Sequence, residues 1–154
     1  MKPITIITET NFNKIKEDIK KNKNKTIIFS SDDDELNRKV LEKLPIDVLL
    51  INQSGRKDFQ KQRNSGFNQV LAKIARKNNI TMGINLDEII NSKQKTEVLA
   101  RIKQNIKLCN KNKLKMKFIS PSGKIKRNVH DLKALGLVLG MPTWMTSDIV
   151  VESK

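Results

Sequence analysis

The sequence contains no tyrosine and only one cysteine, one histidine and one tryptophan among 154 residues. A disulfide needs two thiols, so the single Cys109 excludes an internal one. Aromatic residues make up 4% of the chain, which argues against the stacking platforms used to hold single-stranded nucleic acid. A multi-metal hydrolase gathers several histidine and aspartate ligands, and His130 alone cannot supply them.

Acidic residues are scarce relative to basic ones. The chain has 31 Lys and Arg against 16 Asp and Glu, a formal net charge of +15. A charge this far from zero repels itself and favours an anionic partner. Nucleic acid is the commonest such partner, and an acidic membrane surface is the second.

Long apolar runs are also missing. The chain shows neither a membrane span nor a signal-peptide pattern, so we expect a cytoplasmic protein without membrane attachment. No P-loop, dinucleotide-binding glycine fingerprint or nucleophilic triad is present, which makes independent chemistry improbable. The length and the absence of repeats or linkers predict one domain over residues 1–154.

Apolar runs typical of strands alternate with amphipathic helical patterns along the chain. Strands are predicted at 4–7, 26–29, 47–51, 80–85 and 114–119, and the apolar run in 147–153 fits a last one. Helices are predicted at 11–21, after Ser31, at 66–78, 95–111 and 129–140, with a short turn at 86–90. This alternation predicts an α/β fold with parallel strands and outer helices, while an open sheet and a barrel remain alternatives.

Two helix starts carry capping signals. Ser31 is the predicted N-cap of the second helix, with Asp32, Asp33 and Asp34 in its first turn. A loosely bound cation is the weaker explanation of these three carboxylates. Asn128 with Asp131 resembles a capping box for the helix at 129–140, so Asp131 is expected to be a helix cap.

The loop that precedes the third long helix is rich in cations and amides. It contains Arg56, Lys57, Lys61 and Arg63 among glutamines and asparagines. Loops at the carboxyl ends of parallel strands are where α/β folds place function. A helix that begins at Ser65-Gly66 would direct free N–H groups towards a phosphate there. The alternative is an ordinary amphipathic helix with a solvated basic face.

Several segments, taken in order, resemble a known family. They are "RNSGFN" (63–68), "VLAKIARKNNI", "INLDEII", "RIKQNIKLCNKNKLKMKFIS" and "VHDLKALGLVLGMP", within about Val48 to Pro142. Together they are similar to the ribonuclease P protein component 3 family, the archaeal counterpart of the thirty-kilodalton subunit of eukaryotic ribonuclease P. Each segment alone is weak, and the set is specific.

The resemblance implies a fold and a role. It implies a TIM-barrel-like α/β fold of the polymerase-and-histidinol-phosphatase type. It also implies a protein subunit of the ribonucleoprotein that removes 5′ leaders from precursor tRNA. In that enzyme the RNA subunit performs the hydrolysis with bound magnesium, so no catalytic residue, metal or cofactor is expected on this chain. The implied partners are the ribonuclease P RNA, precursor tRNA, component 2 and other protein subunits.

Candidate site residues follow from the basic loop and from the resemblance. The residues predicted to contact RNA are Arg56, Lys57, Lys61, Arg63, Ser65, Lys73, Arg101, Lys107, Lys126 and Arg127. The residues predicted to have structural roles are Gly66, Asn68, Asn105 and Asp131. Arginine suits phosphate oxygens because its planar guanidinium donates two parallel hydrogen bonds.

The sequence departs from the family pattern in three places. Its first strand, in "MKPITIITET", lacks the Asp-His type segment, and Asn64 stands where the family typically has histidine. Family members are usually longer, whereas this sequence stops soon after Trp144. We therefore expect a trimmed or incomplete barrel.

Two alternative functions remain at this stage. A general basic RNA-binding or ribosome-associated protein would share the charge, but it leaves the ordered segments unexplained. A metal-dependent phosphoesterase would need histidines that the chain lacks. Met141, Trp144 and Met145 are expected to pack beneath the fold, with an exposed patch for a protein partner as the alternative.

Overall fold

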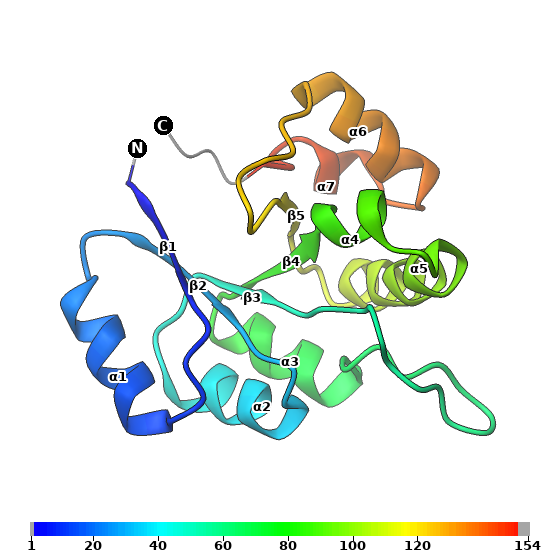
Figure 1. Ribbon diagram of the computed structural model, residues 1–154. Helices are drawn as coiled ribbons and strands as arrows, with labels where there is room; N and C mark the ends of the chain where they lie inside the picture. Colours follow the sequence, from blue (N-terminus) through cyan, green and yellow to red (C-terminus); the bar gives the residue numbers. More distant parts are fainter. Residues whose placement is uncertain (1, 151–154) are drawn as a thin grey trace.

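The computed structural model describes residues 2–150, and it contains a five-stranded parallel sheet (Figure 1). The strands are β1 (Ile4–Ile7), β2 (Thr26–Ser30), β3 (Val48–Leu50), β4 (Thr81–Asn85) and β5 (Met116–Ile119), and each pairs with the next in sequence. Sequential parallel order is that of a TIM-type barrel, since doubly wound sheets reverse their order. Within the described residues β1 and β5 do not pair, so the sheet is an open part of a barrel. This arrangement confirms the predicted α/β fold.

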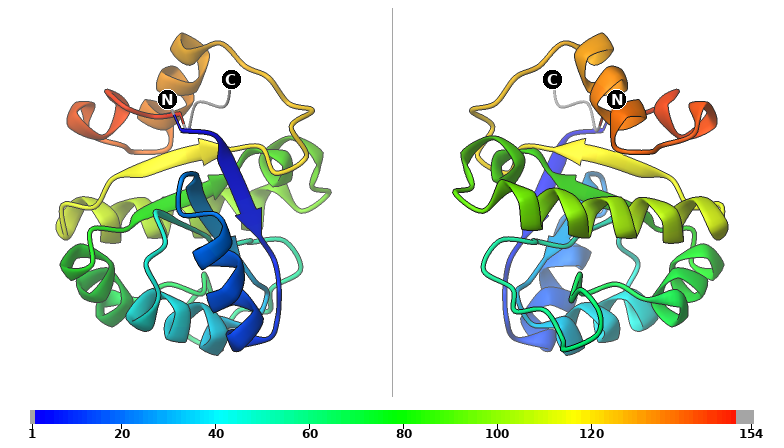
Figure 2. Two further views of the ribbon diagram at one scale, coloured as in Figure 1. Left: turned by 90° about the vertical axis from the view of Figure 1, so that its left-hand side faces the viewer. Right: turned by 90° about the vertical axis from the view of Figure 1, so that its right-hand side faces the viewer.

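Seven helices are present in the described part of the chain. They are α1 (Phe12–Lys21), α2 (Asp34–Lys43), α3 (Gln69–Lys77), α4 (Leu86–Asn91), α5 (Lys95–Lys111), α6 (Val129–Val138) and α7 (Thr143–Thr146). Helices α1, α2 and α3 cover one side of the first strands, and α6 and α7 lie beyond β5 (Figures 1 and 2). Each predicted helix or strand up to residue 140 has a counterpart within three residues of its predicted bounds.

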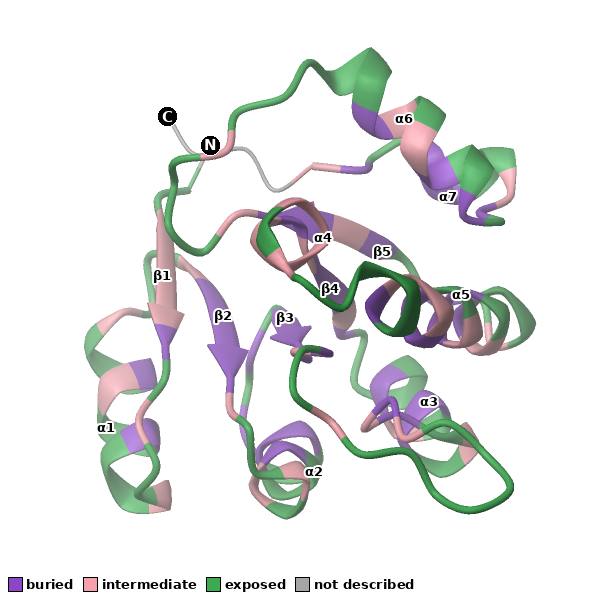
Figure 3. Cartoon of the chain, turned by 45° about the vertical axis from the view of Figure 1, so that its right-hand side comes forward, coloured by how far each residue is buried: buried purple, intermediate pink, exposed green. Residues whose placement is uncertain are grey.

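Both faces of the sheet are buried, as expected for parallel strands that form continuous apolar runs. The face towards the helices carries Phe29, Leu49, Met82 and Phe118, which belong to the main core. The inner face carries a second cluster, formed by Ile28, Val48, Leu50 and Ile119, with Ile4 and Ile6 against it. The central strands are accordingly buried along their length (Figure 3).

The second helix begins at a different cap from the predicted one. Asp33 is the N-cap of α2, and its Oδ1 accepts hydrogen bonds from the amides of Glu35 (3.0 Å) and Leu36 (3.3 Å). The prediction of Ser31 was wrong by two residues, because the Ser31 Oγ accepts from the Asp33 amide instead. Of the three aspartates predicted in the first turn, only Asp34 lies there, since Asp33 is the cap and Asp32 precedes the helix.

The third helix also starts later than predicted. It begins at Gln69, because Gly66 has a φ of +70° and the Asn68 side chain accepts from the Leu71 amide as N-cap (3.0 Å). Asn68 therefore has a structural role as the N-cap of α3, whereas the sequence had suggested that it ties the loop to the end of the strand. Ser65-Gly66 was wrong as the helix start, so the helix does not direct free N–H groups towards a phosphate at that point.

The carboxyl-terminal elements match the sequence only in part. Asn128 caps α6 by accepting from the His130 amide (2.8 Å), and Asp131 lies in its first turn. Within the described residues the reciprocal half of the capping box is not formed. Of the strand predicted at 147–153, the described part shows one parallel bridge, between Phe118 and Val150, and residues 151–153 lie outside it.

The last turn packs as predicted at Met141 and Met145 but not at Trp144. Met141 and Met145 are buried, whereas Trp144 is 37% exposed, with the Lys113 ammonium 5.7 Å from its ring centroid. Cys109 is fully buried in the apolar stripe of α5. No helix in residues 2–150 combines the length and apolar character needed to cross a bilayer.

We expect the inner face to be a packed core rather than a hollow. Replacing Leu50 by Ala should lower the free energy of unfolding by about 2–5 kcal/mol, because Leu50 is 1% exposed and the vacated volume cannot be refilled easily. Leu137→Ala is the matched control, since Leu137 is 50% exposed on α6 and should change stability by less than about 0.5 kcal/mol. Urea unfolding of the two variants measures the difference, and equal destabilisation would contradict a packed inner face.

Candidate functional site

The loop between β3 and α3 is held against the fold by one buried arginine. Arg101 on α5 is 3% exposed. Its guanidinium donates to Asp58 Oδ1 (3.1 Å), to the Gln53 carbonyl (2.9 Å) and to the Arg56 carbonyl (2.9 Å). One side chain thus fixes three points of the loop, because a buried guanidinium must find a partner for each N–H direction.

A second arginine joins the same loop to α2. The Arg56 guanidinium makes a bidentate ion pair with the Asp34 carboxylate, at 2.8 and 2.9 Å, and its Nε donates to the Asn52 carbonyl at 2.6 Å. The Arg56 side chain is only 10% exposed. A bidentate arginine–carboxylate pair neutralises both charges and also fixes the relative orientation of the two side chains.

Gly66 is where the chain passes this ion pair. A Cβ at Gly66 would lie 2.6 Å from Arg56 Nη2 and 2.8 Å from Asp34 Oδ1, and its φ of +70° disfavours other residues. Close packing and the backbone conformation therefore both favour glycine at this position.

In the segment "RNSGFN" (63–68), Ser65 points into the fold. Ser65 is 2% exposed, and its Oγ donates to the Phe67 carbonyl at 3.2 Å. The Ser65 carbonyl accepts from the Gln53 side chain at 2.9 Å. Asn105 is buried on α5, and its Oδ1 has no hydrogen-bond partner among the described residues. These groups shape the loop from inside.

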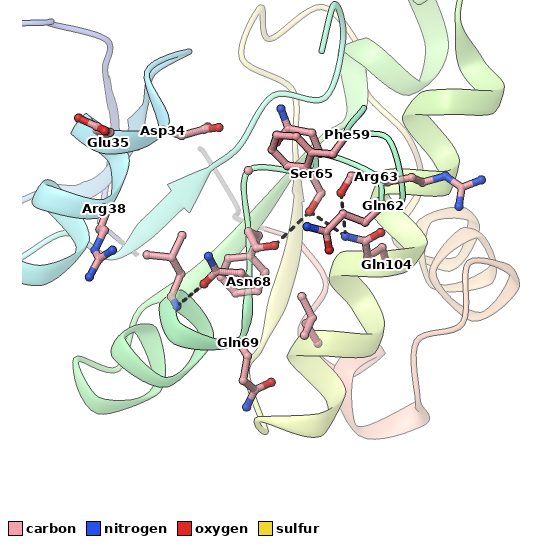
Figure 4. A pocket seen from close by; sticks show the side chains of 15 residues that line it. Asp34, Glu35, Arg38, Phe59, Gln62, Arg63, Ser65, Asn68, Gln69 and Gln104 are labelled. Carbon is pink, nitrogen blue, oxygen red and sulfur yellow. Dashed lines mark hydrogen bonds between the residues drawn. The ribbon is translucent and has the colours of Figure 1, made fainter. Parts of the chain in front are cut away.

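A groove of about 530 Å³ opens beside the loop, between the starts of α2 and α3 and the middle of α5 (Figure 4). Phe59, Gln62, Arg63, Gln69 and Gln104 are among the residues that line it. The Phe59 side chain is 59% exposed. Amide groups, one guanidinium and an aromatic ring provide hydrogen bonding and contact area, but these five side chains include no nucleophile with an adjacent base.

The carboxyl edge of the sheet carries a chain of neutral amides. Asn85 Nδ2 donates to Asn52 Oδ1 at 2.9 Å, and Asn52 Nδ2 lies 3.4 Å from Asp32 Oδ1. Within residues 2–150, no three His, Cys, Asp or Glu side chains are placed to hold a metal ion together. This edge is where barrel enzymes place their catalytic groups.

Two acidic residues that the sequence analysis did not single out order the neighbouring loops. Glu88 accepts from the amides of Gln53 (2.8 Å) and Ser54 (3.1 Å), and burial raises its pKa despite these hydrogen bonds. Asp87 accepts from Ser120 Oγ (2.5 Å) and the Ser122 amide (2.9 Å). Burial acts to raise the pKa of Asp87, but the hydrogen bonds from Ser120 and Ser122 outweigh it and lower the pKa. Their place in "INLDEII", directly after a strand, was the available signal.

The sequence matches the family described as RNase P subunit p30 over residues 4–153. The chain belongs to this family. The resemblance drawn from the ordered segments is thereby confirmed. No curated protein sequence matches the chain.

Two solved structures are similar to the chain, and the first of them shows the same fold. A chain in the cryo-EM structure of archaeal Ribonuclease P with mature tRNA superimposes with a TM-score of 0.76 and 24% identity, over 94% of this chain. The match covers 62% of that longer chain. Deoxyribose phosphate aldolase from Aeropyrum pernix superimposes with a TM-score of 0.49 and 14% identity, over 99% of this chain and 62% of the aldolase chain.

Three residues predicted to contact RNA do not face solvent in this p30-family chain. Arg101 and Ser65 are buried, and the Arg56 guanidinium is occupied by Asp34. The structure corrects these predictions because Asp58 and Asp34 neutralise the two guanidinium groups from within the chain. The available signal for Arg101 was its position three residues after Val98, inside the apolar stripe of α5.

The other predicted RNA contacts are exposed. Lys57, Lys61 and Arg63 lie on the loop, Lys73 on α3, Lys107 on α5, and Lys126 and Arg127 before α6. They therefore come from four separate segments of the chain. Arg63 alone among them lines the groove.

We expect Arg101→Ala to release the loop. Removing a buried guanidinium leaves Asp58 and two carbonyls without their donor, so the free energy of unfolding should fall by about 3–5 kcal/mol. Hydrogen exchange and limited proteolysis within 52–65 should accelerate. Lys103→Ala, an exposed position on the same helix, should leave both measurements unchanged. A drop in stability without faster exchange in the loop would contradict the anchoring role.

The anchor should also give the fold a dependence on acid. The hydrogen bond from the Asn64 amide, followed by that from Arg101, holds the pKa of Asp58 below its usual range. A lowered pKa in the folded state contributes stability above the ordinary aspartate pKa, and this stability is lost as the pH falls through the lowered value. Thermal unfolding of wild type and Asp58→Asn should therefore differ most near neutral pH and converge below about pH 4. A constant difference across that range would show that Asp58 does not titrate as described.

Proposed function

We propose that this chain is a protein subunit of ribonuclease P, which assists the RNA subunit in removing 5′ leaders from precursor tRNA. The match to the RNase P subunit p30 family over residues 4–153 carries the proposal. The shared fold with a chain of archaeal Ribonuclease P supports it. This chain spans 62% of the length of that relative, so the role is proposed for the part of the fold that the chain contains.

In this proposal the chain binds and steadies RNA but breaks no bonds. The cations that remain exposed, Arg63 and Lys73 among them, neutralise backbone phosphates and release their counterions. The amide groups of Asn52 and Asn85 at the carboxyl edge supply hydrogen bonds and are themselves neither general bases nor nucleophiles. Magnesium belongs to the RNA subunit, and the chain itself uses no cofactor.

The partners extend to protein. We propose component 2 and other ribonuclease P proteins as neighbours in the assembly, acting on precursor tRNA in the cytoplasm. A general RNA-binding protein would share the positive charge, but the family match favours the ribonuclease P role. A metal-dependent phosphoesterase is disfavoured by the amides at the carboxyl edge and by the single histidine.

Reconstitution tests the role directly. A holoenzyme assembled from the RNA and the full protein set should cleave precursor tRNA, and omission of this chain should reduce the rate at limiting magnesium. The chain alone should not cleave. Unchanged cleavage after omission would exclude a subunit role, and cleavage by the chain alone would exclude a non-catalytic one.

We expect Arg63 and Lys73 to contribute to RNA affinity. The double substitution by Ala should weaken binding to the ribonuclease P RNA, and the slope of log affinity against log salt should fall by up to about 1.8, at roughly 0.9 for each duplex phosphate that is no longer neutralised. Because both side chains are exposed, the unfolding curve should stay unchanged. Lys93→Ala with Lys95→Ala is the control, which removes the same charge at exposed positions. Binding equal to that of wild type would remove both residues from the RNA surface.

A further inference from the structure

Six lysines surround a pocket that the sequence analysis did not single out. They are Lys2, Lys16, Lys20, Lys23, Lys25 and Lys43, and we call this site the lysine pocket. Its volume is about 560 Å³. All six lysines are exposed, and beneath them lie the buried side chains of Ile19, Ile27 and Leu44. An apolar floor with a rim of ammonium groups is therefore built into the fold.

The lysine pocket lies at the amino edge of the sheet, opposite the loop that Arg101 anchors. Lys2 precedes β1 and Lys25 precedes β2, while Lys43 ends α2. The turn that leads from α1 into β2 passes beside β1, where the Thr26 amide donates to the Pro3 carbonyl at 2.7 Å (Figure 1). Only the fold brings these segments together.

The charge of the lysine pocket is not neutralised within the described chain. In residues 2–150 none of the six ammonium groups lies within 4.0 Å of a carboxylate oxygen. One carboxylate, that of Asp47, lines the pocket, and its Oδ2 accepts from the Ile27 amide at 2.7 Å. Lys16 and Lys20 stand four residues apart on α1, where like charges repel.

Helix ends explain only part of this arrangement. Lys20 and Lys43 lie in the last turns of α1 and α2, where a cation is favoured by the helix dipole. Lys2, Lys23 and Lys25 lie outside the helices, and Lys16 is in the middle of α1. These four lack a local stabilising partner among the described residues, so their gathering points to an external anion.

The opposite edge shows the contrast. There Arg56 and Arg101 are neutralised by Asp34 and Asp58, and further carboxylates such as Glu35 line the groove. At the amino edge six cations face one carboxylate. The lysine pocket therefore carries an excess of unneutralised positive charge at the end of the sheet away from the loop that Arg101 anchors.

We infer that the lysine pocket binds backbone phosphates of a folded RNA. This inference rests on the proposed function, from which we take the RNA to be the ribonuclease P RNA. Among the described residues no aromatic, arginine, asparagine or glutamine side chain lines the pocket, so it offers neither base stacking nor bidentate reading of base edges. Lysine acts on phosphate as a mobile point charge. Recognition is accordingly electrostatic and independent of sequence.

An acidic membrane surface fits the pocket less well. Interfacial binding needs apolar side chains beside the cations. The exposed large hydrophobic residues of the described chain are Phe59, Val70, Val129, Leu137, Val138 and Trp144, and none of them lines the lysine pocket. Phosphates presented by RNA therefore match its chemistry better than phosphates presented by a bilayer.

A charge-matched pair of triple variants tests the inference. One replaces Lys16, Lys20 and Lys23 by Gln, and the control replaces Lys93, Lys95 and Lys103 by Gln, all at exposed positions. Both variants carry three fewer positive charges than wild type. Any difference between their RNA affinities therefore depends on where the lysines lie and not on the net charge. Titration of the ribonuclease P RNA between about 50 and 200 mM salt should show a salt slope lower by up to about 2.7 and at least about tenfold weaker binding at the higher salt for the pocket variant only.

The outcomes separate the inference from the proposed function. If wild type binds and both variants weaken equally, the lysine pocket is excluded while the subunit role stands. If wild type fails to bind the ribonuclease P RNA but binds ribosomal RNA, the proposed function falls. Vesicles containing phosphatidylserine provide the other anionic surface, and tighter binding to them than to RNA would overturn the inference. Circular dichroism and thermal unfolding of the two variants should coincide, as expected for exposed substitutions.

Directed cleavage gives a second readout that does not depend on affinity. The only cysteine, Cys109, is fully buried, and burial raises the pKa of its thiol, so it does not compete for labelling. Lys20→Cys carrying an iron–EDTA group should cut the bound RNA at a defined backbone segment, whereas Lys93→Cys with the same label should not cut there. A bound complex in which the label at position 20 produces no cleavage would overturn the inference.

Discussion

The burial of the Arg101 guanidinium constrains the functional edge of the protein more than any other contact. A charge removed from water is tolerated only when it is paired and fully hydrogen-bonded. Arg101 meets this requirement with Asp58 and with the carbonyls of Gln53 and Arg56. Because all three partners belong to one loop, satisfying the arginine and ordering the loop are the same event.

The ordered loop in turn sets the geometry around it. It places Arg56 against Asp34 at the start of α2, and Gly66 passes beside that pair without a side chain. Asn68 then caps α3. Helices α2, α3 and α5 thus meet through a few polar contacts above a continuous apolar core. The groove beside Phe59 and Gln104 is a product of this arrangement.

The same pairing divides the charges of the chain into two classes. Some cations are neutralised internally and maintain the structure, and others remain in solvent and can meet phosphate. At the carboxyl edge, Asn52 and Asn85 hydrogen-bond to one another, at the position where TIM-barrel enzymes place catalytic groups. On a barrel-like scaffold, function depends on the groups placed at the site rather than on the fold itself.

The sequence by itself determined the alternation of strands and helices, the family and the excess of positive charge. Local patterns suffice for these features, because helix periodicity, strand alternation and capping involve neighbours within a few residues. The long helix at 95–111, which the structure shows as α5, was predicted on this basis. The cap that Asn68 provides is also local, because Asn68 lies three residues before the amide that it caps, but the sequence analysis did not identify it as a cap.

The tertiary structure alone decided which cations are free. Arg56 pairs with a carboxylate 22 residues away, and Arg101 with one 43 residues away, and no periodicity reports such contacts. The lysine pocket is assembled from the amino terminus, α1, the turn after it and the end of α2. Electrostatic energies depend on distance and burial in space. Whether a given cation is paired or free is therefore decided only by the folded structure.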